Sequence, residues 1–397
     1  MVIKRREFLQ IGSLATAALM MPKFLQAFSK KALPLPGNKV VVVIQFSGGN
    51  DGLNTVIPVR NDIYYNARPN LGITKDNALL LTDEVGLHPA LTGLRDLYND
   101  GSLGILNGVG YPNPDRSHFR SMDIWQTAAN SDEYTTTGWI GRYLDAQCKG
   151  CDKPTGALEI DDILSLALKG VDNNGIAFKD PGRLYTTSNE TYFKDINLAH
   201  HAGEETADYL YKTMSETLSS ADYIFQQSKL RATTAIYPDT QFGKDMKTIS
   251  SLIQSDINTT IYYVSIGSFD THVNQDAQQK KLFTQFSDAI KVFTDDLKKN
   301  NRFDDVLLFT FSEFGRRVAQ NASGGTDHGT ANNIFLIGGG LKQKGLINPL
   351  TDLADLDEGD LKYKIDFKSV YATVLNKWLN ANDSNILGRQ YEYLNFI

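Results

Sequence analysis

The chain has 397 residues, of which 41% are hydrophobic and 22% are charged, and its formal net charge is −6. This length and composition are typical of a globular protein with one large core or two smaller ones, and they argue against a largely disordered chain. The negative net charge argues against a nucleic-acid partner, because binding to phosphate backbones needs clustered Lys and Arg side chains.

Residues 1–32 are predicted to be an export signal and its linker. The segment KRREFLQ (4–10) has a paired arginine followed by two bulky apolar residues, and a weakly apolar stretch (11–21) comes next. This order resembles a twin-arginine signal, although the first and last residues of the segment depart from the usual pattern. The alternative is a basic amphipathic helix. The stretch is shorter than the roughly 20 residues of a membrane span. We therefore expect a bacterial protein exported to the periplasm or the medium by the twin-arginine machinery, with no membrane span in its mature chain.

Continuous apolar runs and segments of helical periodicity then follow one another along the chain. This alternation predicts an α/β fold with a doubly wound, mostly parallel sheet that is flanked by helices. We expect the domain to occupy residues 37–397. The predicted strands are 39–46, 103–110, 261–267, 304–312 and 332–340, and the clearest predicted helices are 89–101, 275–299 and 366–380.

Residues 150–258 interrupt this alternation, because they are polar and contain few long apolar runs. The segment 202–230 has the periodicity of a helix. We expect a mainly helical cap inserted into the α/β domain. The only two cysteines, Cys148 and Cys151, lie near its start in a predicted loop, where a structural role is favoured over a redox role.

Polar residues that can carry chemistry follow the predicted strands. In open α/β sheets, ligands bind beyond the carboxyl ends of the strands, so we expect these residues to meet at one edge. Three of the six histidines are among them. In chain order, the candidates are Asp51 after the first strand, Ser117 and His118 after the second, Asp270 and His272 after the third, Glu313 and Arg316 after the fourth, and Asp327 and His328 before the fifth.

This combination of residue types indicates a metal site. Carboxylates mixed with imidazoles suit Zn²⁺ or a similar ion, whereas oxygen ligands alone suit Mg²⁺ or Ca²⁺. A hydroxyl group near such ions can lose its proton and become a nucleophile. Taken singly, each residue has a structural alternative: Asp51 could cap a turn, Ser117 could cap a helix, and Glu313 could pair with a nearby arginine. The joint pattern favours the metal site.

Several motifs in this order resemble one known family. They are KRREFLQIG, FSGGNDGLNTVIP, RSHFRSMDIWQT, FDTHVNQ, SEFGRR, DHG and DFKSVYATVLNKWL. Together they are similar to the exported bacterial family called "domain of unknown function 1501", which is grouped with the alkaline phosphatase and sulfatase superfamily. The resemblance implies an alkaline-phosphatase-like core with a two-metal esterase site.

The resemblance also implies roles for individual residues. Ser117 would be the nucleophile, and His118 or Arg316 would steady the oxygens of the substrate. The implied metal ligands are Asp51, Asp270, His272 and His328.

Glu313 stands where the resemblance leads one to expect an Asp-His pair, with Phe314 in place of the histidine. One of the two sites would then have only oxygen ligands, from Asp51, Glu313 and the hydroxyl group of Ser117, and would prefer Mg²⁺, Ca²⁺ or Mn²⁺ to Zn²⁺. His118 or Asp327 could compensate for the missing imidazole.

The sequence thus predicts an exported, metal-dependent hydrolase of phosphate or sulfate esters, with one or two divalent ions per chain and a small-molecule or glycan ester as substrate. The alternative is a non-catalytic exported protein that binds a glycan or a partner through the cap. The aromatic residues that support the alternative are Tyr185, Tyr192, Tyr209, Tyr211, Tyr223 and Tyr237.

Overall fold

The computed structural model describes residues 39–147, 154–191 and 205–397. The predicted export signal, 1–32, lies outside the described residues. So do Cys148 and Cys151, and so does Tyr192 of the predicted cap.

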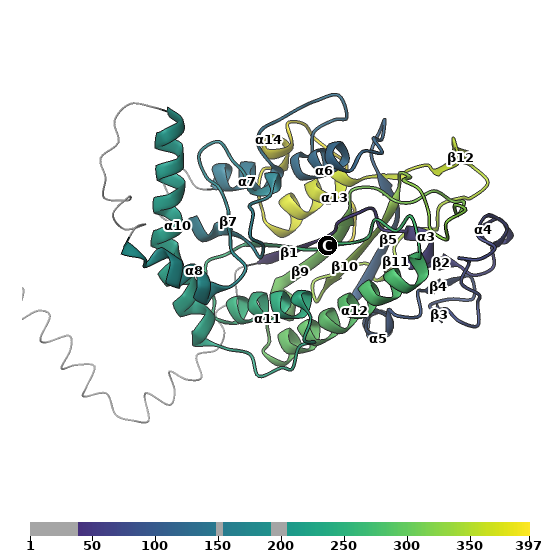
Figure 1. Ribbon diagram of the computed structural model, residues 1–397, viewed down its shortest axis with the longest axis horizontal. Coiled ribbons are helices and arrows are strands. Elements are labelled where there is room, and N and C mark those ends of the chain that lie inside the picture. The colour runs from purple at the N-terminus through teal and green to yellow at the C-terminus, as the bar shows by residue number, and fades with distance from the viewer. Residues whose placement is uncertain (1–38, 148–153, 192–204) are drawn as a thin grey trace, which may run out of the picture. The chain divides into compact units, whose positions relative to one another are not determined.

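Within the described residues, a nine-stranded sheet forms the centre of the domain (Figure 1). The strand order is β11-β5-β10-β9-β1-β8-β6-β7, and β14 also pairs with β5. Only β10 runs antiparallel to its neighbours in this sheet. The predicted α/β class is therefore confirmed. The strands are β1 (Val40–Phe46), β5 (Leu103–Gly110), β6 (Ala157–Glu159), β7 (Ile176–Ala177), β8 (Ile261–Ile266), β9 (Val306–Ser312), β10 (Asn332–Gly338), β11 (Gly345–Leu346) and β14 (Ile365–Asp366).

Helices cover both faces of this sheet, with α11 and α12 below it and α6, α7 and α13 above it in Figure 1. Along β1, Val42 and Ile44 pack into the core on the first face, while Val41 and Val43 pack into the core on the second. Because both faces are covered, β1 has no polar alternation. The first layer contains α5 (Thr92–Asn99), α11 (Gln241–Gln254) and α12 (Gln275–Lys299), and the second contains α6 (His118–Thr127), α7 (Trp139–Gln147), α13 (Phe367–Thr373), the π-helical turn Val374–Trp378 and α14 (Asp383–Leu387).

The segment predicted as a cap, 150–258, is mainly helical where it is described. It contains α8 (Pro181–Ser188), α10 (Glu205–Leu230) and α11. It also supplies β6 and β7 to one side of the sheet, which its polar sequence did not indicate. None of the helices among the described residues combines the length and the apolar character needed to cross a membrane.

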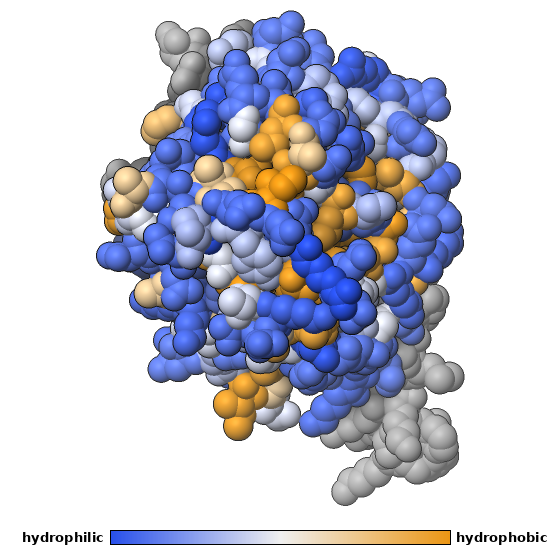
Figure 2. All heavy atoms as spheres, turned by 90° about the vertical axis from the view of Figure 1, so that its right-hand side faces the viewer, coloured by the Kyte–Doolittle hydropathy of each residue, from blue (hydrophilic) through white to orange (hydrophobic). Residues whose placement is uncertain are grey.

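The parallel strands end at one level. Phe46, the last residue of β1, pairs with Ile266 of β8 and with Ser312 of β9. The loops after these strands therefore start side by side, as expected for parallel strands. Figure 2 shows the side of the molecule that carries α3 (Gly52–Thr55), the short helix after β1. On this side, hydrophilic residues surround apolar residues that are exposed near the middle.

The other small elements are α4 (Asp62–Ala67), β2 (Val56–Pro58), β3 (Leu79–Leu80), β4 (Val85–Leu87), β12 (Leu356–Asp357) and β13 (Asp360–Leu361).

Two glycines allow the loop after β1 to approach its neighbours. Gly48 and Gly49 have φ angles of +119° and +77°, which side-chain-bearing residues rarely adopt. A Cβ atom on Gly48 would lie 2.4 Å from the backbone nitrogen of Asp270, and one on Gly49 would lie 2.3 Å from the ring of Phe314. The glycines are therefore needed for close packing of the loop after β1 against the loops after β8 and β9.

Asp51 ends this loop and has a structural role. One carboxylate oxygen accepts hydrogen bonds from the backbone N–H groups of Leu53 (3.1 Å) and Asn54 (3.4 Å) and so caps α3. The other oxygen lies 2.6 Å from Nη1 of Arg68 and also accepts a hydrogen bond from Gln275. The side chains of Asp51 and Arg68 are fully buried. The prediction that Asp51 binds a metal ion is therefore not supported, because both oxygens are already bound by the protein.

We expect Arg68→Met to lower the free energy of unfolding by about 3–5 kcal/mol, because it leaves the charge of Asp51 buried without its positively charged partner. Urea unfolding measures this change. The matched control is Arg60→Met, which breaks the Arg60–Asp83 pair. Since those side chains are 55% and 81% exposed, the control should cost at most about 1 kcal/mol. Equal effects of the two substitutions would contradict a structural role for the buried pair.

Candidate metal centre

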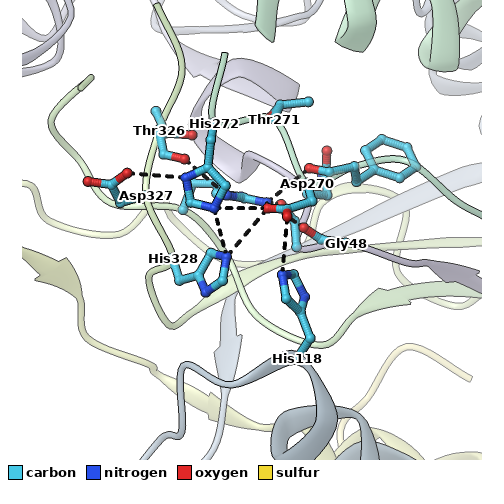
Figure 3. Close-up of polar contacts among 12 residues, drawn as sticks. Gly48, His118, Asp270, Thr271, His272, Thr326, Asp327 and His328 are labelled. Atoms are coloured by element: carbon cyan, nitrogen blue, oxygen red, sulfur yellow. Dashed lines mark hydrogen bonds and ion pairs between the residues drawn. The ribbon is translucent and has the colours of Figure 1, made fainter. Parts of the chain in front are cut away.

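Three imidazoles converge on one carboxylate at the carboxyl edge of the sheet (Figure 3). Asp270 and His272 lie in the loop between β8 and α12, His328 lies in the loop before β10, and His118 is the first residue of α6. The sequence-based expectation that these loops meet is confirmed for these four residues, which come from three separate parts of the chain.

The convergence involves the Nε2 atom of each ring. The Nε2 atoms of His272, His328 and His118 lie 3.1, 3.4 and 3.5 Å from the nearest oxygen of Asp270. The Nε2 atoms of His272 and His328 are 3.0 Å apart. His118, Asp270 and His328 each offer a ligand atom, and these atoms lie within 4.8 Å of one another.

The Nδ1 atom of each ring is bound to an oxygen that accepts hydrogen bonds. His118 Nδ1 lies 2.9 Å from a carboxylate oxygen of Glu313, His272 Nδ1 lies 3.2 Å from one of Asp327, and His328 Nδ1 lies 2.8 Å from the carbonyl oxygen of Arg116. A carbonyl oxygen cannot donate, so Nδ1 of His328 carries the proton and Nε2 of the neutral ring carries the lone pair.

The other two rings also have an accepting oxygen at Nδ1, because a carboxylate only accepts. The Nε2 atoms therefore face one another and Asp270, and either a metal ion among them or a proton on one of them relieves the repulsion between lone pairs. A set of imidazole nitrogens and one carboxylate, with carboxylates behind the rings, suits Zn²⁺ or a similar divalent ion. Asp270 and the three histidines could therefore hold such an ion.

The centre is open to solvent. The side chain of Asp270 is 46% exposed, and those of His272, His118 and His328 are 42%, 32% and 23% exposed. An ion held here could thus take a further ligand from outside the protein, which is characteristic of catalytic rather than structural metal sites.

Arg316 holds the loops together from beneath the centre. Its side chain is fully buried and lies 2.7 Å from a carboxylate oxygen of Asp270. The expectation that Arg316 contacts substrate is therefore corrected, because its guanidinium group is used inside the protein. Its other hydrogen bonds go to the backbone carbonyl oxygens of Gly48, Gly49, Phe269 and Thr326.

Glu313 is a buried partner of His118, and its role as a metal ligand stays a prediction. One of its oxygens accepts hydrogen bonds from the backbone N–H of Gly48 (2.7 Å) and from His118. Asp51 is likewise bound to Arg68. The predicted oxygen-only metal site, built on these two carboxylates, is therefore not supported among the described residues.

Asp327 also has a supporting role, because it binds Nδ1 of His272 and the side-chain amide of Asn321. The role of Asp327 as a metal ligand stays a prediction.

Ser117 lies beside the centre and is exposed. It occupies the N-cap position of α6, but its side chain makes no capping hydrogen bond. The residue before it supplies the carbonyl group that binds His328, and the residue after it is His118. This placement is compatible with the predicted nucleophile, whose role stays a prediction.

Phe314 is a residue whose role the sequence did not indicate. The centroid of its ring lies 4.9 Å from that of His118 and 4.6 Å from that of His328. It therefore packs against two rings of the centre. The nearby Gly49 was the available signal, since the ring leaves no room for a Cβ atom there.

The pKa values follow from these contacts. The hydrogen bond to Glu313 raises the pKa of His118 above its ordinary value, while burial lowers the pKa of His328. Burial alone would raise the pKa of Asp270, but the hydrogen bond and positive charge of Arg316 outweigh it and lower this pKa. Asp270 is therefore charged at neutral pH, and His328 is neutral and able to bind a metal ion.

Residues 196–383 match the model of a family described as "Protein of unknown function (DUF1501)". The predicted resemblance to that family is confirmed. No curated protein matches this chain in sequence.

The fold was also compared with solved structures. The chain is similar to the PsFucS1 sulfatase from Pseudoalteromonas sp., with 11% identity over 94% of this chain and 72% of the other, at a TM-score of 0.42. It is similar to the C-terminal periplasmic domain of EcEptC from Escherichia coli in complex with Zn, with 13% identity over 77% and 75% of the chains and a TM-score of 0.36. A protein in the alkaline phosphatase superfamily from Vibrio parahaemolyticus has 12% identity over 89% and 69%, with a TM-score of 0.36.

We expect the purified protein to bind one Zn²⁺ ion per chain. Asp270→Asn should weaken binding by at least about a hundredfold, and Asp327→Asn, which removes a supporting carboxylate, by about 10- to 100-fold. Isothermal titration and elemental analysis measure these changes. The matched control is Asp76→Asn, which replaces an exposed carboxylate of another loop and should leave binding unchanged. Zn²⁺ binding that Asp270→Asn does not weaken would contradict the proposed ligand set.

In the metal-free protein, Glu313→Gln should lower the pKa of His118 toward its ordinary value of about 6.5, because the accepting carboxylate is lost. NMR titration of the imidazole protons measures this pKa, with the buried His88, whose pKa shift involves neither Glu313 nor His118, as an internal control. A raised folded-state pKa stabilises the protein below the unfolded-state pKa, and this contribution is lost as the pH rises through the folded-state pKa. The loss of stability in Glu313→Gln should therefore be larger below about pH 6.5. An unchanged pKa of His118 would refute the pairing.

Proposed function

We propose that this chain is a metal-dependent hydrolase of phosphate or sulfate esters that uses Ser117 as its nucleophile. The observation that carries the proposal is the convergence of three imidazole Nε2 atoms on Asp270 in a solvent-exposed position. The exposure of this centre, with the exposed hydroxyl of Ser117 beside it, supports ester hydrolysis better than a purely structural metal site, which is usually closed to further ligands.

In this proposal Asp270, His272 and His328 hold one divalent ion, and three protein ligands leave a position for substrate. When bound, the ion polarises an ester oxygen and lowers the pKa of a nearby hydroxyl group. Arg316 holds Asp270 in place, and Asp327 and the carbonyl of Arg116 hold the two rings in orientation.

His118 has a different task in the proposed reaction. It lies farthest from Asp270, at 3.5 Å, and its Nε2 atom has no hydrogen-bond partner. The hydrogen bond to Glu313 raises its pKa, and in its protonated form it can donate a hydrogen bond to an anionic ester oxygen.

Ser117 would attack the phosphorus or sulfur atom, so that a bond to its Oγ forms as the bond to the leaving alcohol breaks. Water then cleaves the resulting serine ester and regenerates the hydroxyl group. The exposure of Ser117, and its position between Arg116 and His118, support this assignment. The twin-arginine-like sequence at the N-terminus supports an exported enzyme, which is part of the same proposal.

We expect the metal-loaded protein to hydrolyse an aryl phosphate or an aryl sulfate. A chelator should abolish this activity, and Ser117→Ala should lower kcat roughly a thousandfold or more, since removal of a nucleophile has effects of this order. A steady-state assay of both substrates, with Zn²⁺, Mn²⁺ or Mg²⁺ restored in turn, measures the activity.

The matched control is Ser384→Ala in α14, which should retain full activity. Elemental analysis of Ser117→Ala should show the same metal content as the unaltered protein. Hydrolysis that survives both the chelator and Ser117→Ala would refute the mechanism.

A further inference from the structure

A cavity of about 380 Å³ lies on the side of Phe314 that faces β12 and the turn before α6. Phe314 forms part of its wall and also packs against His118 and His328. Asn113 and Pro114, three to four residues before Ser117, form another part. The cavity and the metal centre are therefore neighbours that share one aromatic side chain.

Three aromatic residues line the cavity, Tyr111, Phe314 and Tyr363, together with Leu361 and Ala331. The hydroxyl group of Tyr111 lies 2.8 Å from that of Ser121, so this ring presents mainly apolar surface to the cavity. Tyr363 is 38% exposed and stands at the solvent side. Aromatic walls of this kind favour a ring-shaped ligand.

Polar side chains complement these rings. Asn113, Thr330, Asp357 and Lys362 line the cavity, and of these Asn113 and Asp357 are exposed. An amide both donates and accepts hydrogen bonds, and a carboxylate accepts them. An unsubstituted aromatic ring would offer no hydrogen bond to the amide of Asn113 or the carboxylate of Asp357. The hydroxyl groups of a sugar ring can bind both. The volume is at the lower end of small-molecule sites, roughly 300–1,000 Å³, and thus suits one or two rings.

We propose that this cavity binds a sugar ring of the substrate, so that the ester cleaved at the metal centre is carried by a carbohydrate. This proposal names the substrate class of the proposed hydrolase. It rests on that function in one respect, because it takes the bound ring to be part of the substrate. The rim of the centre agrees with an organic ligand of some size: Phe119 and Val273, which follow His118 and His272 in sequence, are 87% and 57% exposed.

The test measures the binding of a panel of methyl pyranosides to the zinc-loaded protein. Saturation-transfer difference NMR detects this binding. We expect at least one pyranoside to bind and phenol to bind more weakly. Tyr363→Ala should weaken binding of that pyranoside by about five- to tenfold, and Tyr363→Phe should restore it, because the aromatic face is retained. Asp357→Ala should weaken it by about fivefold.

The matched control is Tyr134→Ala, which removes an exposed tyrosine that lies against Arg120 and should leave sugar binding unchanged. Thermal unfolding and Zn²⁺ binding verify that each variant is folded. The inference is overturned if no pyranoside binds, if phenol binds better than every pyranoside, or if Tyr363→Ala behaves as the control does.

These outcomes are separate from those of the hydrolysis assay, because sugar binding requires no turnover. Sugar binding without ester hydrolysis would refute the proposed hydrolase and leave a carbohydrate site. Chelator-sensitive hydrolysis without sugar binding would refute the assignment of the cavity.

Discussion

The arrangement of the candidate site depends on one buried guanidinium group. Arg316 donates hydrogen bonds to the loop after β1, to the loop after β8 and to the loop before β10. A buried cation is tolerated only when its donors are satisfied, so the three loops cannot separate without leaving this charge unpaired. The ion pair of Arg316 with Asp270 then fixes the carboxylate on which the imidazoles converge. The buried contacts of Arg316 thus fix the position of Asp270 in the centre.

A second group of side chains fixes the rings from behind. Glu313, Asp327 and the carbonyl of Arg116 each bind one Nδ1 atom, which directs the opposite nitrogen toward Asp270. Burying Glu313 carries a desolvation cost, and its hydrogen bonds with His118 and the N–H of Gly48 offset part of it. Glu313 and Asp51 are thus both bound within the protein, and whether the chain holds one ion or two stays a prediction.

Much of the fold, and the place of the site, could be predicted from the sequence. The apolar run of β1 reflects burial on both faces, and parallel strands bring their following loops to one edge, so the meeting of Asp270, His272 and His328 follows from pattern and topology. The roles of other residues could not be predicted, because they depend on partners that only the fold supplies. Asp51 meets Arg68 from α4's end, and Arg316 turns inward to backbone carbonyls of three loops.

Phe314 affects the candidate metal centre through its packing against two histidines. An aromatic ring at this position offers no ligand atom, and its packing against His118 and His328 places apolar surface beside the centre. Burial of this kind lowers the pKa of His328, which keeps its Nε2 atom free of a proton at neutral pH. The absence of a Cβ atom on Gly49 makes room for the ring. Phe314 therefore helps to keep one imidazole of the centre available, and it also forms part of the wall of the adjoining cavity.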